Sequence, residues 1–292
     1  MRVAVYGKFI SAEARPYIED LHEQLLAEEA EISVFEDLNH FIADHCALGV
    51  KFQSFRNHRD LRQFEPDFLI TIGGDGTILD AATLVRDSGI PVLGINTGRL
   101  GFLSNVSKEE IKPAIKAIRE GKYSLDERSL LTLEGEVEDL DLNFALNEVT
   151  VSRKDTTAMV KIKVWINEQF LNNYWADGLI IATPTGSTGY SLSCNGPIIM
   201  PDAENLVLTP IAPHNLNVRP FVIPNNYVIR LQVESREEQF LVSLDSRIYS
   251  VPKGGDLTIR RAAFKIRLVQ THIQSFAQTL RNKLMWGIDK RN

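Results

Sequence analysis

The pattern of apolar and polar positions divides the chain into two parts near residue 122. Before that point, short apolar runs such as RVAVYG, EISVF, PDFLITI and IPVLGIN alternate with segments of helical periodicity. In residues 11–30 the apolar positions recur every three or four residues, at Tyr17, Ile18, Leu21, Leu25 and Leu26. Strands that alternate with helices predict a Rossmann-like α/β domain, in which a mostly parallel sheet is covered by helices on both faces.

Two further helices are expected in this first part. Residues 77–87 present one apolar face, made up of Ile78, Leu79, Ala82 and Val85. Residues 107–121 form the other helix, with Ser107 as its N-cap, acidic residues in its first turn and Gly121 at its end. Residues 47–64 are polar and basic, and their pattern indicates no particular element.

After residue 122 the helical period fades, and apolar runs separated by turn residues predict strands. These runs are LLTLEGEV, NEVTVSR, MVKIKVWINEQFLNNYWA, GLIIATP, LVLTPIA, YVIRLQV, QFLVSLD and LTIRRA. The pattern predicts an all-β domain of two packed sheets over residues 123–268, after an α/β domain over residues 1–122. Residues 269–292 regain helical spacing, and we expect them to form a helix that packs back on the first domain.

Composition and charge narrow the functional classes. The chain has 292 residues and a formal net charge of −6, so no bulk electrostatic attraction to nucleic acid or membrane is expected. The first residues lack the apolar core of a signal peptide, and no apolar run approaches membrane-spanning length. Cys46 and Cys194 are the only cysteines, and the six histidines show no ligand-like spacing, so we assign no residue to a metal. We expect a cytoplasmic protein.

The stretch IGGDGTIL, residues 72–79, directly follows an apolar run and precedes a predicted helix. A glycine-rich turn between a strand and a helix lets the backbone approach an anion closely, although GG and DG pairs also occur in ordinary tight turns. The stretch is neither a Walker loop nor a GxGxxG fingerprint. A carboxylate at such a place, Asp75, suits a base that accepts a proton from an attacking hydroxyl, or a group that helps to hold a divalent metal.

The string GGDGT also occurs in a superfamily of small-molecule kinases, which includes NAD kinases, diacylglycerol and sphingosine-type lipid kinases and, more distantly, phosphofructokinases. Further blocks select one branch, because INTGRLGFL, NEVTVSR, DGLIIATPTGSTGYSLSCNGPI, APHNLNVRPFVIP and LRNKLMWG resemble the NAD kinase family in order and spacing. The resemblance covers nearly the whole chain. Lipid kinases typically continue GGDGT into an NE pair, whereas ILDAA follows here. A GGDGT lipid kinase and a non-catalytic NAD-binding sensor remain the alternative hypotheses.

The resemblance implies that a divalent metal ion, normally Mg²⁺, assists transfer of a phosphoryl group from ATP to the 2′-hydroxyl of the adenosine ribose of NAD. It implies that Asp75 is the general base, with the metal held mainly by the donor's phosphates. The predicted nucleotide-binding residues are Gly73, Gly74, Asp75, Gly76, Asn147, Glu148, Asp177, Thr185, Thr188, Gly189, Tyr190, Ser191, Leu192 and Ser193. Gly73 to Gly76 belong to the first domain and the other residues to the second. A single dinucleotide that contacts residues of both domains is expected to lie between them.

Some positions depart from the family or carry weaker signals. Gly189 replaces the usual alanine of TGSTAYS, and we expect altered packing around the ligand. Asp245 and Arg247 fall at a family hairpin that borders the ligand, and Arg99 occupies a variable position. Most of the lysines and arginines in residues 151–163 are expected to alternate along strands on solvated faces. The resemblance also implies a homodimer or homotetramer, formed through the β domains around a two-fold axis.

Overall fold

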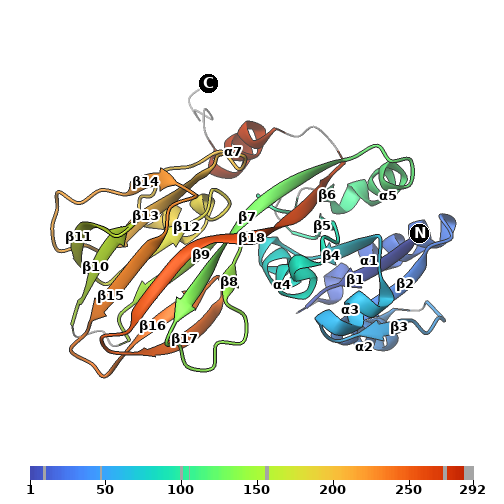
Figure 1. The fold of residues 1–292 in the computed structure, drawn as a ribbon. Coiled ribbons are helices and arrows are strands. Elements are labelled where there is room, and N and C mark those ends of the chain that lie inside the picture. The colour runs from blue at the N-terminus through green and yellow to red at the C-terminus, as the bar shows by residue number, and fades with distance from the viewer. Residues whose placement is uncertain are drawn as a thin grey trace. The chain divides into compact units, whose positions relative to one another are not determined.

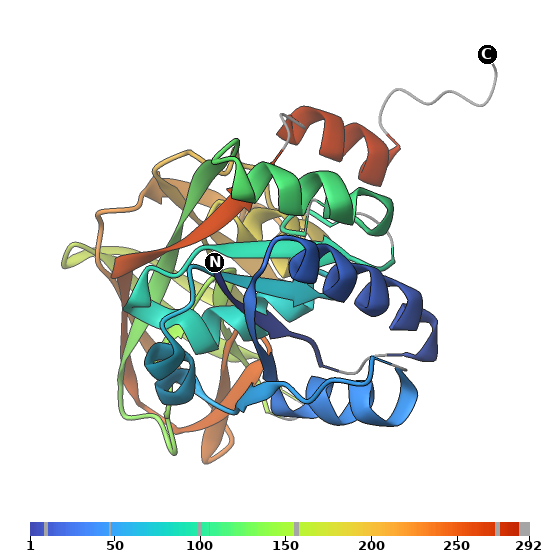
Figure 2. The ribbon, with the colours of Figure 1, turned by 90° about the vertical axis from the view of Figure 1, so that its right-hand side faces the viewer.

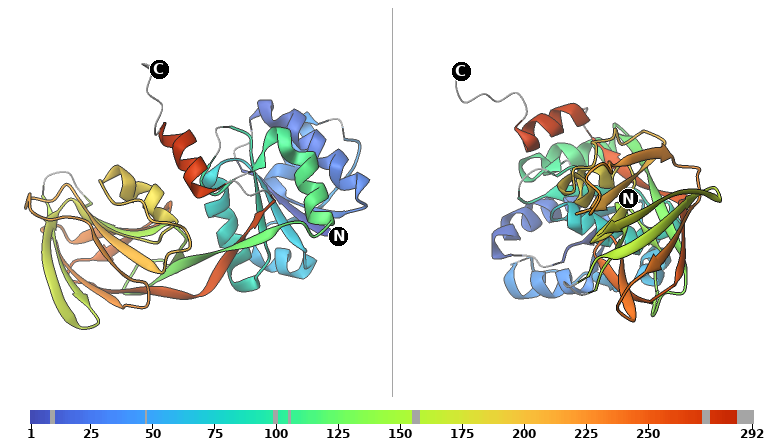
Figure 3. Two further views of the ribbon diagram at one scale, coloured as in Figure 1. Left: turned by 90° about the horizontal axis from the view of Figure 1, so that it is seen from above. Right: turned by 90° about the vertical axis from the view of Figure 1, so that its left-hand side faces the viewer.

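The computed structural model describes residues 1–8, 11–46, 48–98, 101–104, 106–154, 158–271 and 275–285 (Figure 1). Arg99 therefore lies outside the described residues. The chain divides into two compact units, which we call the α/β unit (Met1–Glu127 and Ile266–Asn292) and the β unit (Arg128–Lys265). Two long strands, β7 (Ser124–Gly135) and β18 (Asp256–Gln270), contain the points at which the chain passes from one unit into the other (Figure 3).

The α/β unit is built on a parallel sheet with the strand order β5–β4–β1–β2–β3. Its strands are β1 (Arg2–Tyr6), β2 (Glu31–Phe35), β3 (Gln53–Phe55), β4 (Phe68–Ile72) and β5 (Val92–Asn96). The short β6 (Val106–Ser107) and the end of β18 both pair with β5 in parallel. All residues of β4 and β5 are buried, as expected for strands covered on both faces.

Helices lie on both faces of this sheet. The helices of the unit are α1 (Arg15–Ala27), α2 (Glu36–His45), α3 (His58–Phe64), α4 (Asp75–Val85), α5 (Ile111–Arg119) and α7 (Phe276–Leu284), with 3₁₀ turns at Ala12–Ala14, Arg86–Ser88 and Lys108–Glu110. Helices α1 and α5 run side by side (Figure 2), and their buried residues join those of α2 in one apolar cluster with the sheet. The expected N-cap is confirmed, because Ser107 and Glu110 form a capping box.

The structure differs from the expectation in two places in this unit. Helix α4 begins at Asp75, two positions before the predicted start at Thr77, so the motif aspartate is its first residue. Residues 36–64 hold α2, β3 and α3, which the sequence pattern did not predict. The pattern is weak there because α2 buries only Leu38 and Ile42, and β3 has only three residues.

The β unit consists of two sheets. In one, β11–β10–β15–β18 pair antiparallel, and β7 and β8 join at the β18 side. The other has the antiparallel order β14–β13–β12–β9–β16–β17. The strands are β8 (Phe144–Ala145), β9 (Glu148–Ser152), β10 (Val160–Ile166), β11 (Gln169–Ala176), β12 (Gly178–Ala182), β13 (Asn205–Ile211), β14 (Phe221–Pro224), β15 (Ile229–Glu234), β16 (Gln239–Leu244) and β17 (Arg247–Pro252).

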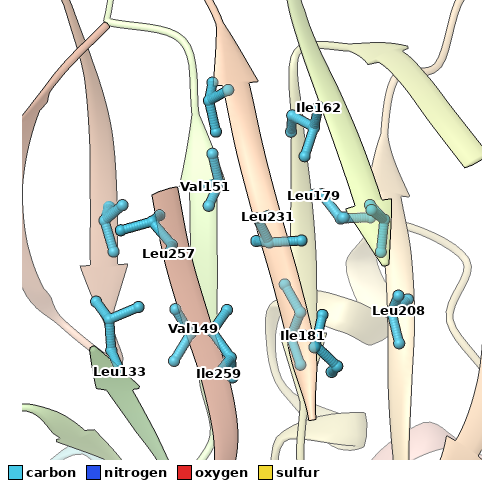
Figure 4. Packing of buried hydrophobic residues seen from close by; sticks show 14 of the residues in the cluster. Leu133, Val149, Val151, Ile162, Leu179, Ile181, Leu208, Leu231, Leu257 and Ile259 are labelled. Atoms are coloured by element: carbon cyan, nitrogen blue, oxygen red, sulfur yellow. The ribbon is translucent and has the colours of Figure 1, made fainter. Parts of the chain in front are cut away.

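The core of the β unit lies between its two sheets. Strand β10 alternates as expected, because Val160, Ile162 and Val164 are buried while the lysines between them are half-buried. They pack with inward side chains of both sheets, among them Val149, Val151, Leu179, Leu231 and Leu257 (Figure 4). Each fully buried aliphatic side chain contributes roughly 1.5–3 kcal/mol.

One predicted strand is a hairpin. The run MVKIKVWINEQFLNNYWA forms β10 and β11, joined by Asn167 and Glu168. Both turn residues have positive φ, 47° and 64°, which is the backbone of a type I′ turn. The pattern concealed this turn because it lacks the glycine that usually marks one.

In the described residues no helix is both long enough and apolar enough to cross a membrane.

Candidate functional site

The glycine-rich stretch lies at the carboxyl end of β4. Successive strands are added on one side of β1 as far as β3 and then on its other side from β4, so the order of the sheet reverses between β1 and β4. Loops that leave the carboxyl ends of strands at such a reversal are the usual ligand sites of open α/β sheets. The α/β unit therefore presents residues 73–76 at the edge where its fold favours a ligand.

The three glycines of the motif have different roles. Gly73 has a φ of +153°, and an added Cβ would lie 2.1 Å from Oγ1 of Thr77, so the turn itself requires glycine. Gly74 and Gly76 have negative φ, and an added Cβ would meet nothing within 4 Å. The chain's own packing does not require glycine at these two positions. Their missing side chains leave open space beside Asp75, as the close approach of a ligand requires.

The carboxylate of Asp75 is held by residues 102–104, which we call the donor loop. Its Oδ2 accepts a hydrogen bond from the backbone N–H of Phe102 at 2.8 Å. Its Oδ1 accepts from the N–H groups of Leu103 and Ser104, at 3.0 and 3.1 Å, and from the Ser104 hydroxyl at 3.2 Å. Four donors therefore converge on one carboxylate, and all of them stabilise its charged form.

A cation from the C-terminal helix completes this arrangement. Nζ of Lys283 on α7 lies 3.7 Å from Oδ2 of Asp75, and both side chains are 29% exposed. The same ammonium lies 4.6 Å from the centre of the Phe102 ring, and Phe276 packs against that ring at 5.9 Å. The expected packing of the C-terminal helix on the first unit is thus observed, and it brings a positive charge to Asp75.

Two glycines allow the donor loop to approach the carboxylate. An added Cβ at Gly101 would lie 1.8 Å from Oδ1 of Asp75, and one at Gly94 would lie 2.8 Å from Cα of Ser104. The Ser104 hydroxyl also accepts a hydrogen bond from Nδ2 of Asn96 at 2.8 Å. The sequence pattern predicted no role for Gly101, Ser104 or Lys283. The available signal was the glycine three residues before Ser104.

In the β unit, the predicted pair Asn147 and Glu148 lies at the start of β9. Its backbone is fixed by Asp245, whose carboxylate accepts N–H hydrogen bonds from Leu146, Asn147 and Glu148 at 2.9, 2.7 and 3.2 Å. Burial raises the pKa of Asp245, and these hydrogen bonds oppose the shift. Asp245 therefore acts on the predicted site through the backbone of residues 146–148.

The side chains of this pair are incompletely satisfied. Oδ1 of Asn147 and Oε2 of Glu148 are buried and have no hydrogen-bond partner among the described residues. Burial, and next the charge of Asp245, raise the pKa of Glu148 to about 8, so its carboxyl is largely protonated at neutral pH. An added Cβ at Gly189 would lie 3.3 Å from Oε2 of Glu148 and 3.6 Å from Nδ2 of Asn147. The departure from alanine thus leaves space next to the unpartnered Oε2 of Glu148 and next to Nδ2 of Asn147.

The run from Thr183 to Ser193 forms the 3₁₀ turn η4 (Gly186–Thr188) and the short helix α6 (Tyr190–Ser193). Several of its hydroxyls are used internally. Thr185 accepts from Arg128 at 3.3 Å, Thr188 donates to the Thr185 carbonyl at 3.2 Å, and Ser191 bonds Thr209 at 2.8 Å. The Tyr190 ring and Ser193 are exposed, while Leu192 is half-buried. These hydroxyls shape the turn, and its exposed groups remain accessible to a ligand.

Asp177, a predicted ribose acceptor, forms an ion pair. Its Oδ2 lies 2.9 Å from a guanidinium nitrogen of Arg153, and the two side chains are 26% and 28% exposed. Arg153, one of the basic residues of 151–163, is only partly exposed because it pairs with this carboxylate. Asp177 keeps partial access to solvent beside its cation.

The described residues contain no group of three or more His, Cys, Asp or Glu side chains that could hold a metal ion. Around Asp75 the neighbouring groups are N–H donors, a hydroxyl and an ammonium, which suit an anion and not a cation. These groups therefore fit a divalent metal ion only when the ion is already bound to the phosphate oxygens of a nucleotide. Asp75 would then be the carboxylate next to that ion.

Two family profiles match the chain. The ATP-NAD kinase N-terminal domain matches residues 4–123, and the ATP-NAD kinase C-terminal domain matches residues 146–271. A protein of Flavobacterium psychrophilum named NAD kinase is 51% identical over 296 residues, with 100% of both chains covered. A protein of the same name from Bacteroides fragilis is 44% identical over 292 residues, again with 100% of both chains covered.

Solved structures resemble the fold. An NAD kinase from Archaeoglobus fulgidus in complex with ATP is 26% identical with a TM-score of 0.75, covering 98% of this chain and 99% of that one. Yeast NADH kinase complexed with NADH has a TM-score of 0.87 at 24% identity, covering 99% of this chain and 89% of that one. The predicted combination of a Rossmann-like domain, a two-sheet β domain and a C-terminal helix is confirmed.

Proposed function

The chain belongs to the NAD kinase family, and from this premise we propose that it transfers the terminal phosphoryl group of ATP to the 2′-hydroxyl of the adenosine ribose of NAD. The products are NADP and ADP. The observation that carries the proposal for this chain is the open space at Gly74 and Gly76 beside the carboxylate of Asp75. That arrangement offers a base where a phosphate group has room to approach.

In the proposed reaction, Asp75 acts as the general base. The 2′-oxygen forms a bond to the terminal phosphorus while the bond from that phosphorus to the bridging oxygen of ADP breaks, and the hydroxyl proton passes to the Asp75 carboxylate. A general base accelerates such steps on the order of 10²- to 10⁴-fold. A divalent ion bound to the phosphates would neutralise the negative charge of the transferring group.

The β unit supplies the proposed contacts to the nucleotide. Oδ1 of Asn147 and Oε2 of Glu148 are buried and unpartnered among the described residues, so polar groups of a nucleotide would satisfy them. Asp177 can accept from a ribose hydroxyl while it remains paired with Arg153. That one dinucleotide reaches both Asp75 and these residues stays a prediction.

The assay combines the purified protein with NAD, ATP and Mg²⁺, and NADP is measured with an NADP-specific dehydrogenase. Formation of NADP that depends on both substrates supports the proposal. A parallel reaction with radiolabelled ATP and a lipid dispersion tests the lipid-kinase alternative, in which label enters the lipid and not NAD. Binding of NAD without NADP formation would instead indicate a non-catalytic sensor.

We also propose that the chain forms a homodimer or homotetramer through β11. Among the described strands β11 pairs only with β10, and its sequence, QFLNNYWA, contains neither charge nor proline. Phe170 and Trp175 on it are each 56% exposed. Open edges are normally protected by charge, proline or a partner strand, and β11 has neither of the first two. The same edge of a second copy is the partner that a two-fold axis supplies.

Light scattering tests this assembly. Trp175→Lys places a charge at the exposed edge and is expected to shift the protein toward the monomer at micromolar concentration. Leu216→Lys is the control, because Leu216 is 84% exposed and lies outside β11. A monomeric wild-type chain would contradict the proposal.

The two cysteines are both free thiols, which agrees with the proposed location in the reducing cytoplasm.

A further inference from the structure

The groups that contact Asp75 form a set composed only of donors. Three successive backbone N–H groups, from residues 102–104, point to one anion together with the Ser104 hydroxyl. The ammonium of Lys283 lies 3.7 Å from the same carboxylate. Successive N–H groups of this kind form concave anion sites, and a lysine is a common cation in phosphate sites. The chemistry of the set suits a phosphate as well as a carboxylate.

With these hydrogen bonds in place, Asp75 is poorly prepared to act as the general base. An ionised carboxylate has about four lone-pair sites for hydrogen bonds. Here Oδ1 accepts three hydrogen bonds, while Oδ2 accepts one and faces the ammonium. A substrate hydroxyl that donates its proton to Asp75 has to compete with these donors, because the one site of Oδ2 without a hydrogen bond faces the ammonium of Lys283. The base therefore has to leave part of this set before it can act.

We propose that the donor loop and Lys283 form the binding site for the terminal phosphate of the nucleotide donor, and that Asp75 fills this site as an internal anion until the donor arrives. The phosphate displaces the carboxylate from the set, and the displaced carboxylate is then available to the acceptor hydroxyl. This inference rests on the proposed function. In this arrangement the base becomes available only when a phosphoryl donor is present.

The surroundings of the set allow this exchange. Gly74 and Gly76 leave open space next to Asp75, so a phosphate has room to enter. Asp75 and Lys283 are each 29% exposed, so neither group is sealed from solvent. When a phosphate replaces the carboxylate, each donor keeps an acceptor. A donor left without a partner would be costly, and the exchange avoids this cost.

The test measures binding of inorganic tripolyphosphate by titration calorimetry with the full chain. This probe has no nucleoside, so it does not report on the NAD-binding residues of the β unit. Asp75→Ala removes the internal anion and is expected to tighten binding of the probe. Removal of a negative charge has this effect in any site, so a second change is needed to locate the phosphate.

Second changes are therefore made in the Asp75→Ala background. Lys283→Met and Ser104→Ala are each expected to raise the Kd for tripolyphosphate about tenfold or more, because each removes a charged hydrogen bond to the probe. In the wild-type background the same changes are expected to have smaller effects, since they weaken the competing Asp75 contact too. Arg281→Met is the matched control on α7, because Arg281 is exposed, and its effect should stay within about twofold.

If Lys283→Met and Ser104→Ala leave the Kd of the Asp75→Ala protein unchanged, or if that protein does not bind tripolyphosphate, the set only orients Asp75 and the inference is wrong. Ser104 also bonds Asn96, so a thermal melt checks that Ser104→Ala folds. If it does not fold, the Lys283→Met result decides. NADP formation by the wild-type chain tests the proposed function separately, since it does not depend on where the phosphate binds.

Discussion

Two aspartates, one in each unit, accept hydrogen bonds from three consecutive backbone N–H groups. Asp75 accepts from residues 102–104 and Asp245 from residues 146–148. Their surroundings differ, because the side chain of Asp245 is 5% exposed and that of Asp75 is 29% exposed. Asp75 also has open space at two neighbouring glycines, whereas Asp245 is enclosed at the turn between β16 and β17.

The hydrogen-bond pattern alone therefore does not identify a catalytic group. Both carboxylates join a loop to a distant part of the chain, and either could be purely structural. Access for a ligand distinguishes Asp75, because each carboxylate has a cation nearby: Lys283 lies 3.7 Å from Asp75 and Arg247 lies 4.0 Å from Asp245. Mutations that separate stability from turnover should therefore give opposite results at the two positions.

The largest expected effect is the loss of turnover in Asp75→Asn. An amide keeps the size of the side chain, and its oxygen can still accept from Leu103 and Ser104, but its NH₂ group cannot accept from Phe102 and the side chain cannot take up the hydroxyl proton. We expect kcat for NADP formation to fall on the order of 10²- to 10⁴-fold. The melting temperature should stay close to that of the wild type. Near-normal kcat in this variant would mean that another group is the base.

Asp245→Ala should show the converse. It leaves three N–H groups at the start of β9 without their acceptor, and unsatisfied buried donors cost about 1–3 kcal/mol each, so we expect a loss of about 3 kcal/mol or more in the free energy of unfolding. Denaturant unfolding measures this loss. Asp245→Asn, which keeps an acceptor oxygen and tolerates the positive φ of 54° at this position, should lose less. A fall in kcat without a loss of stability would place Asp245 in the chemistry.

Gly101→Ala tests the geometry of the donor loop. Because the added Cβ would lie 1.8 Å from Oδ1 of Asp75, the carboxylate or the loop has to move. A displacement of about 1 Å near reacting groups lowers turnover about 10²-fold, and we expect a loss of that size in kcat. Gly74→Ala is the matched control for folding, since its Cβ would meet nothing within 4 Å. It should melt like the wild type but raise the KM for ATP.

Much of the fold could be predicted from the sequence because its strands and helices follow local patterns. The capping box at Ser107, the alternation in β10 and the buried face of α4 are each determined by residues close in sequence. The turn at Asn167 was missed because its positive φ is adopted without glycine. Helix α2 was missed because it buries only two residues.

The candidate site was predictable only in part, for a different reason. Asp75 was recognised because a whole motif surrounds it. Its partners are backbone N–H groups of the donor loop, and a backbone donor has no signature in the side-chain sequence. Lys283 comes from the far end of the chain, and Asp245 is separated from Asn147 by 98 positions. Such contacts depend on the tertiary fold.

The smallest predicted effect is the dependence of stability on pH, which we attribute to the carboxyl of Glu148. Burial raises the pKa of Glu148 from an ordinary 4.5 to about 8, and the pKa of Asp245 is raised in the same direction. Between these values the folded protein holds a proton on Glu148 that the unfolded chain has lost. Stability from this group is therefore fully present below pH 4.5 and decreases as the pH rises toward 8.

We expect the melting temperature of the wild-type protein to fall between pH 6 and pH 9. In Glu148→Gln this fall should be smaller by a few degrees, because about 1 kcal/mol of stability corresponds to 2–4 °C in a protein of this size. Glutamine keeps the shape and removes the titration, so the slopes of the two proteins differ by the contribution of this carboxyl. Equal slopes for wild type and Glu148→Gln would mean that Glu148 is charged in the folded protein at neutral pH. The unpartnered Oε2 would then need a cation or a donor from the ligand.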